Sequence, residues 1–267
     1  VIAVYNEDLI IDSLTDHGYS LSEARKFAND GCWEIQIPGR TRFIYQPMDL
    51  YGAFLRDVLC LDAEHPAVYD DFESMYDAFR EKMDLILDGF HANADHFFWG
   101  SQSGVIDLFE DGCIENARAY HDGGPIYNAF SPHFGGIPDT ANAMYAIRKL
   151  VFEEKKLSFA DFMDILKNNW EGEEALRQYV RNHYTYYGND SEADGWLCRI
   201  LRDFAELVHA CNREDVAPVK FVPGVSTFGR QVDWLPNRTA TAFGYRKGDI
   251  LAGNDSPTPG TDCAGAT

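Results

Sequence analysis

The chain has 267 residues, of which 45% are apolar and 25% charged, and its formal net charge at pH 7 is −20. This balance is typical of a globular protein with one large domain or two small ones. The excess of acidic side chains argues against nucleic acid and anionic membrane surfaces as partners, because both bind clustered Lys and Arg.

Two further sequence features bear on location. There is no run of about 18 apolar residues and no basic segment followed by an apolar core, so we expect neither a membrane span nor a secretory signal. The six cysteines contain no CxxC pair and are spread along the chain, at positions 32, 60, 113, 198, 211 and 263. We therefore expect free thiols in a reducing cytoplasm.

In the N-terminal part, helices alternate with short strands. The first residues are expected to belong to a strand. Ser20 and Ser22 precede a helix start, and Gly31 is expected to end that helix region. Residues 32–37 alternate with β-type side chains until Pro-Gly stops them, which predicts a strand. Residues 46–60 and 70–98 are expected to be helices, and the second has apolar residues at helical spacing.

The remainder is dominated by helices. Residues 101–120 are expected to be a helix leading into a Gly- and Pro-rich loop over 123–138. Four further helices are predicted, at 140–154, 158–169, 172–182 and 192–212, and strand and loop follow from Val219. This helix-rich α/β pattern fits a barrel or layered architecture better than an all-helical bundle.

Several common catalytic and metal-binding motifs are missing from the sequence, including HExxH, a P-loop, GxSxG and a GxGxxG after a strand. We expect no metal site. The pair of interest is Cys32 and Glu34, because residues i and i+2 of a strand point to the same face. A carboxyl group buried beside a thiol in a barrel could exchange protons near neutral pH. The structural alternative is a buried Cys beside a Glu that pairs with an Arg.

The sequence around Cys32 and Glu34 resembles that of a known family. The run Asp30-Gly-Cys-Trp-Glu-Ile-Gln-Ile-Pro-Gly-Arg-Thr41 resembles the active-site Cys segment of glycyl radical enzymes, which typically reads Gly-Cys-Val-Glu-Pro-Gln-x-Pro-Gly-Lys-Thr. Further segments match in the family's order, at 111–128, 146–156, 170–177, 187–190 and 256–267. Trp33 and Ile35 depart from the usual Val and Pro. Ala240-Thr-Ala-Phe-Gly-Tyr245 stands where the family has Ala-Thr-Pro-Asp-Gly-Arg.

The resemblance implies a fold. We expect residues 1–267 to form a single helix-rich region, the C-terminal portion of a ten-stranded glycyl radical enzyme α/β barrel. The N-terminal half of that barrel and the C-terminal Arg-Val-x-Gly-Tyr loop with the radical glycine are expected to be absent from the chain. On this view the chain alone is inactive.

The resemblance also implies a chemistry. Cys32 would carry a thiyl radical and Glu34 would be its acid/base partner. No cofactor is expected in this chain, because the glycyl radical would sit on the missing C-terminal segment and be installed by a radical-SAM activating enzyme. No second Cys flanks Cys32, which argues against formate-lyase chemistry. We expect cleavage of a C–O, C–N or C–S bond in a small hydroxylated substrate.

Alternatives to this reaction remain. One is an arylacetate-type radical decarboxylase. Others are a non-catalytic homologue, or a split enzyme completed by a partner carrying the glycine. The remaining expectations are a homodimer in the cytoplasm of an anaerobic bacterium, either free or within a microcompartment.

Three other residues are weaker candidates for substrate contacts. Ser226 and Phe228 lie two apart on a predicted strand, where the family places substrate contacts, and ordinary strand residues are the alternative. His133 falls in the predicted Gly-rich loop, where a surface or capping role is the alternative. Cys113 has its own Cys-x-Glu, with Glu115, and is interpreted as structural.

Overall fold

The computed structural model describes residues 6–29, 34–65, 67–97, 104–212, 219–225 and 230–264. The chain divides into two compact units. The first comprises Val1–Tyr45, Asn93–Ser131 and Glu214–Lys220, and the second Gln46–Ala92, Pro132–Arg213 and Phe221–Thr267.

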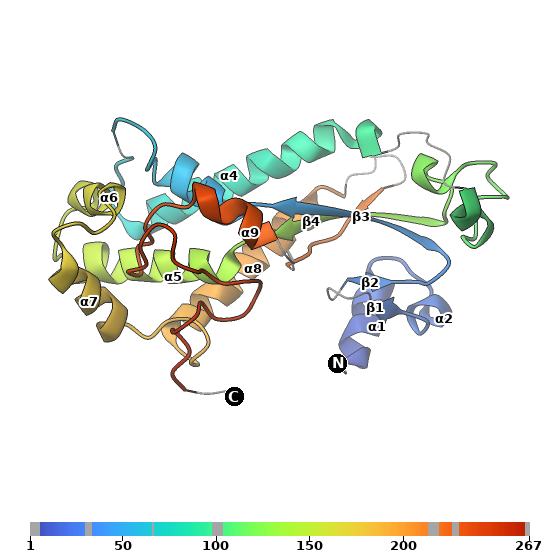
Figure 1. Ribbon diagram of the computed structural model, residues 1–267. Helices are drawn as coiled ribbons and strands as arrows, with labels where there is room; N and C mark the ends of the chain where they lie inside the picture. Colours follow the sequence, from blue (N-terminus) through green and yellow to red (C-terminus); the bar gives the residue numbers. More distant parts are fainter. Residues whose placement is uncertain are drawn as a thin grey trace. The chain divides into compact units, whose positions relative to one another are not determined.

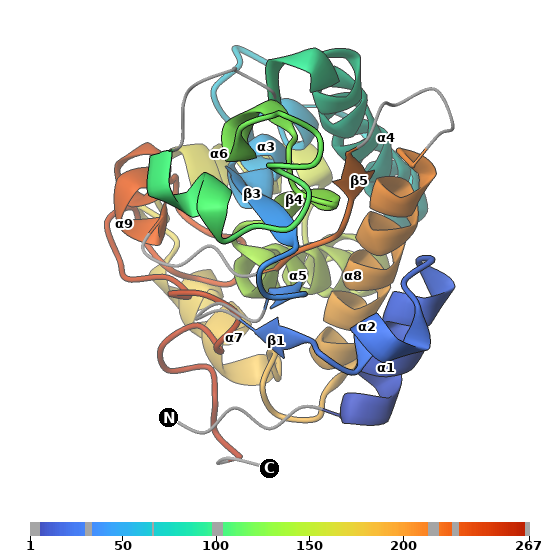
Figure 2. The same cartoon turned by 90° about the vertical axis from the view of Figure 1, so that its right-hand side faces the viewer.

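The first unit begins with two short helices and a small hairpin, grouped together in Figure 2. These are α1 (Glu7–Asp16), α2 (Leu21–Ala24), β1 (Ala28–Asn29) and β2 (Ile35–Gln36). Asn6 and Ser20 act as N-caps, their side chains accepting the amides of Leu9 and Glu23. The predicted helix start near Ser20 is confirmed, but the helix ends at Ala24 and Ala28–Asn29 form a strand, so the helix region expected to reach Gly31 is wrong. Any strand at the first residues stops before Glu7, because the N-cap Asn6 and the acidic first turn start a helix there.

The second unit is built from helices (Figure 1). They are α3 (Leu50–Ala53), α4 (Phe72–Ala92), α5 (Ile137–Ile147), α6 (Phe159–Lys167), α7 (Glu174–His183), α8 (Glu192–Ala210) and α9 (Arg230–Trp234). Helices α3 and α5 run on into π-helical turns at Phe54–Val58 and Arg148–Glu153. All eleven residues of α5 are buried, and α5 and α4 both pack against α8. Five of the six helices predicted between residues 70 and 212 are thereby confirmed.

A three-stranded sheet has the order β3-β4-β5, with β3 at Thr41–Met48, β4 at Tyr127–Phe134 and β5 at Lys220–Phe221. The expected loop over 123–138 is therefore wrong, because β4 lies within it. Seven of the eight residues of β4 are buried, so the strand lacks the alternation of a half-exposed strand. Pro132, which has no N–H, uses its carbonyl instead and accepts from the Gly224 amide at 3.0 Å.

Two predicted helices also differ. Residues 46–48 end β3 rather than starting a helix, and the helix begins at Leu50 after the N-cap Asp49. The stretch 101–120 contains only 3₁₀ turns at Gly104–Leu108 and from Tyr120 among its described residues. The α/β, helix-rich character is confirmed. The described strands form one two-stranded and one three-stranded sheet that do not close, so the ten-stranded barrel stays a prediction.

Candidate active site

Glu34 is the one member of the predicted catalytic pair that the structure describes. Only 8% of its surface is exposed, and it directly precedes β2. Among the described residues 34–37 of the predicted strand, Ile35 and Gln36 form β2, so Glu34 is not a strand residue. Asn29 of β1 pairs with Ile35, which fixes where the backbone goes directly after Glu34. Cys32, Ser226 and Phe228 lie outside the described residues.

A tight turn follows Glu34 and explains the Pro-Gly-x-Thr part of its motif. The Arg40 amide donates to the Ile37 carbonyl at 3.1 Å, and Gly39 has φ +73°. Proline at the second position and a glycine with positive φ at the third are typical of a type II turn. Thr41 closes the turn, because its hydroxyl accepts the Ile37 amide at 3.1 Å. The motif residues after Glu34 thus define the backbone path there.

Arg40 ties this turn to distant parts of the first unit. Its guanidinium pairs with Glu23 of α2 and lies 3.1 Å from the Asp111 carboxylate. Tyr127 donates its hydroxyl to the same Glu23, and its amide donates to the Arg40 carbonyl at 2.9 Å. The Asp111 amide donates to the Gly39 carbonyl at 2.7 Å. We call these four residues, Glu23, Arg40, Asp111 and Tyr127, the turn clamp.

Cys113 carries the other Cys-x-Glu of the sequence, and its surroundings are those of a structural residue. It is 3% exposed, and burial, with acidic neighbours, raises the pKa of its thiol. A thiol with a raised pKa is a poor nucleophile. A Cβ on Gly124 would lie 2.8 Å from its sulfur, so the thiol fills space beside a glycine.

His133 belongs to the second unit and is 1% exposed on β4, so neither the expected loop nor a surface role is correct. Its ring lies on the face of Gly224, where a Cβ would be 2.4 Å from the imidazole Cε1. The backbones are joined there by a parallel bridge, in which the Phe134 amide donates to the Gly224 carbonyl at 2.9 Å. His133 is therefore a packed residue of the sheet.

A buried carboxyl group on α5 was missed by the sequence reasoning. Asp139 is fully buried, and Thr258 donates its hydroxyl to it at 2.7 Å. The Ala252 amide also donates to it, at 3.4 Å. Burial raises the pKa of Asp139 to about 6, opposed by these hydrogen bonds and by Arg238. The Ser-Pro-Thr motif in the sequence could have pointed to this site, because the hydroxyl of its Thr258 is the one that donates to Asp139.

Two absences concern the described residues alone. Within the ranges given above, no group of three or more His, Cys, Asp or Glu side chains could hold a metal ion. None of the described helices is both long and apolar enough to cross a membrane. Five cysteines are described, and all are free thiols, as predicted for them.

Comparison with known proteins decides the family. A family model described as pyruvate formate lyase-like matches residues 1–234. The chain belongs to this family of glycyl radical enzymes. The family resemblance of the Gly-Cys-x-Glu segment and the later motifs is thus confirmed. The turn and the turn clamp after Glu34 therefore belong to a member of the glycyl radical enzyme family.

Family members with known names are similar over nearly the whole chain. The (2S)-3-sulfopropanediol dehydratase of Klebsiella oxytoca is 23% identical over 95% of this chain and 33% of its own length. The isethionate sulfite-lyase of Bilophila wadsworthia is 27% identical over 98% of this chain and 34% of its own. The glycerol-bound B12-independent glycerol dehydratase of Clostridium butyricum superimposes with a TM-score of 0.86, at 22% identity, over 99% of this chain and 35% of that one. This chain spans about a third of these relatives.

Proposed function

We propose that this chain carries the thiyl-radical residue and the acid/base residue of a glycyl radical lyase or dehydratase, Cys32 and Glu34. The observation that carries the proposal is family membership together with a Gly-Cys-x-Glu segment whose Glu34 is buried ahead of a clamped type II turn. The named relatives, which are dehydratases and a sulfite-lyase, support the reaction class.

The proposed reaction divides the work between the two side chains. The Cys32 thiyl radical takes a hydrogen atom from a substrate carbon that bears a hydroxyl, which leaves a thiol and a carbon radical. Glu34 as carboxylate takes the hydroxyl proton, and the group on the next carbon leaves with its bonding electron pair. The resulting carbonyl radical then takes the hydrogen atom back from the Cys32 thiol.

Burial of Glu34 suits this role for a physical reason. A carboxylate shielded from water is a stronger base toward a substrate hydroxyl than a hydrated one, because desolvation disfavours its charged form. A positioned base typically contributes about 10²–10⁴-fold in rate. The clamp and the type II turn restrict the backbone next to Glu34, and positioning of this kind is what proton transfer requires.

The proposal includes parts outside the described residues. The radical glycine would come from another segment of the complete protein, and a radical-SAM activating enzyme would install it. We also propose that the chain contributes to a ten-stranded barrel in a cytoplasmic homodimer. A barrel interior would exclude water and oxygen, which thiyl chemistry needs.

The test is electron paramagnetic resonance of the complete protein, activated anaerobically, with trial diols, amino-alcohols and sulfonates. Wild type and Cys113→Ser should show a glycyl doublet and turnover. Cys32→Ser should keep the doublet and lose turnover. Glu34→Gln should keep the doublet and lose about 10²–10⁴-fold in kcat.

Different failures have different meanings. Absence of a doublet in the activated wild-type protein would refute the radical proposal as a whole. A doublet with full turnover in Glu34→Gln would refute only the acid/base role. Consumption of arylacetates instead of hydroxylated substrates would replace elimination with decarboxylation.

A further inference from the structure

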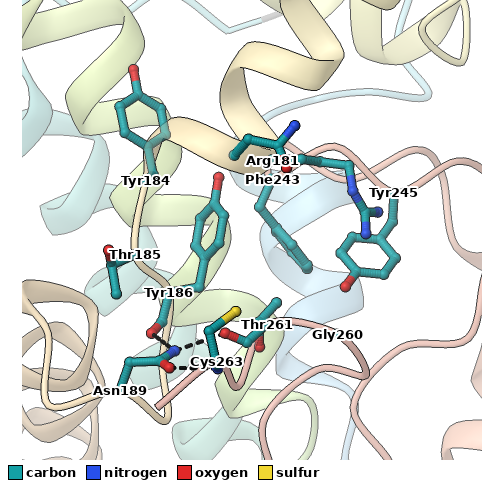
Figure 3. Close-up of a pocket in the computed structure, with 11 residues that line it drawn as sticks. Arg181, Tyr184, Thr185, Tyr186, Asn189, Phe243, Tyr245, Gly260, Thr261 and Cys263 are labelled. Carbon is teal, nitrogen blue, oxygen red and sulfur yellow. Dashed lines mark hydrogen bonds between the residues drawn. The ribbon is translucent and has the colours of Figure 1, made fainter.

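A cavity of about 330 Å³ opens in the second unit, away from Cys32 and Glu34 in the sequence. Its walls come from the C-terminal end of α7, the segment after that helix, and two later stretches near 243–245 and 260–263 (Figure 3). This volume is within the range of small-molecule sites. None of its lining residues takes part in the proposed reaction.

Four aromatic rings, those of Tyr184, Tyr186, Phe243 and Tyr245, line the cavity together with polar side chains. The tyrosine hydroxyls of Tyr184 and Tyr186 donate away from the cavity: Tyr186 to the Val180 carbonyl at 2.9 Å, and Tyr184 to Glu154, also at 2.9 Å. The rings therefore offer their faces and edges rather than their hydroxyl protons. Such a lining suits a flat, apolar ligand body.

The aromatic lining arises where the sequence departs from the family motif. Phe243 and Tyr245 occupy the positions where the motif has Asp and Arg, within Ala240–Tyr245. Gly244 between them has φ +91°, and a Cβ there would lie 2.4 Å from Arg181 Cγ. The glycine thus lets the Arg181 stem pass close to the backbone. Two of the aromatic lining residues are therefore departures of this chain from the family motif.

Arg181 supplies the one positive charge in the lining. Its guanidinium lies over the Tyr245 ring, 4.2 Å from the centroid (Figure 3). It forms no ion pair with any residue in the described ranges, although Arg177 and Arg246 nearby both pair with Glu174. Asp249 lines an adjoining cavity of about 450 Å³ that shares Arg181 and Tyr245. Its carboxylate accepts the Arg246 amide at 2.7 Å.

We propose that this cavity binds a small aromatic carboxylate. The guanidinium of Arg181 pairs with the carboxylate, and the ring of the ligand packs among Tyr184, Tyr186 and Phe243. An arginine without a carboxylate partner among the described residues favours an anion at this position over a cation. Stacking on Tyr245 holds the guanidinium plane in place, which reduces the entropy lost on binding.

The first test is calorimetric titration of the complete protein with benzoate, and with benzamide as the uncharged analogue. Benzoate should bind and benzamide should bind at least tenfold more weakly. Arg181→Gln should weaken benzoate binding by about 10- to 100-fold, the range for losing a hydrogen-bonded charge partner. Arg202→Gln removes an exposed arginine of α8 and should leave binding unchanged.

The second test needs no variant of the cavity, so it holds even if Arg181→Gln fails to fold. Cys263 is exposed and lines the cavity, whereas Cys198 is exposed on α8. Benzoate should slow alkylation of Cys263, read by mass spectrometry, and leave Cys198 unaffected. The proposal is overturned if benzoate fails to bind, if it binds no better than benzamide, or if it leaves Cys263 alkylation unchanged.

Discussion

Replacing Asp139 with asparagine should stabilise the protein at neutral pH, because the native carboxyl is buried in a place that disfavours its charge. Its pKa is raised from 3.8 to about 6, mainly by burial. Asparagine has nearly the same shape and can still accept from Thr258 and Ala252 through its carbonyl oxygen. The variant therefore keeps the anchor to α5 without the ionisable group.

The magnitude follows from linkage. A group whose folded pKa is raised contributes stability that is fully present below its unfolded pKa and is lost as pH rises through its folded pKa. For a shift from 3.8 to about 6, at 1.36 kcal/mol per pH unit, the full loss is about 3 kcal/mol. A little over 1 kcal/mol of it, roughly, should fall between pH 5 and pH 7.

The assay is urea unfolding of wild type and Asp139→Asn at several pH values from 4.5 to 8. Other carboxyl groups titrate in both proteins, including Asp255, whose pKa burial also raises to about 6. Their contributions cancel in the difference between the two free energies of unfolding. That difference should grow in favour of the variant up to about pH 7 and then level off. A difference that is constant over this range would refute the reasoning.

Two further substitutions test the packing of the second unit. Gly224→Ala places a Cβ 2.4 Å from the His133 ring and should destabilise the protein by about 1–3 kcal/mol. The control Gly195→Ala has open space around its Cβ on α8 and should not destabilise the protein, and thermal unfolding of both variants measures the difference. Arg238→Met removes the two hydrogen bonds of 2.6 and 2.7 Å that Asp49 accepts from Arg238, and it should cost about 1–3 kcal/mol in urea unfolding. The double variant Asp49→Asn/Arg238→Met should lose less than the sum of the two single variants, and an additive loss would contradict this pairing.

The predictable parts of the fold are those in which local sequence and burial agree. α4 and α8 each have one apolar face and were found from their periodicity, and Ser191 caps α8 with a capping box. β4 was missed because burial on both faces removes the alternation, and Pro132 argues against a central strand. Its strand character comes from neighbours that lie far away in the sequence.

In the candidate site, too, contiguous residues could be predicted from the sequence and long-range pairs could not. The Cys-x-Glu segment and its Pro-Gly turn are contiguous, so their motif could be read directly from the sequence. The pairing of Asp139 with Thr258 joins residues 119 positions apart, so the Ser-Pro-Thr motif could mark Thr258 but not its partner. The contact between Gly224 and the His133 ring also joins distant parts of the sequence. The glycines and prolines near His133 had predicted a loop there.

The turn clamp also has a consequence for how the protein is made. Its last member, Tyr127, is added about ninety residues after Glu34. At about 5–20 residues per second, a ribosome needs roughly 5–20 s to cover that distance. Until Asp111 and Tyr127 have been added, the contacts available to the turn after Glu34 are its own hydrogen bonds within 37–41 and the Arg40–Glu23 pair. The turn clamp next to the candidate acid/base residue is therefore completed only after Glu34 itself has emerged.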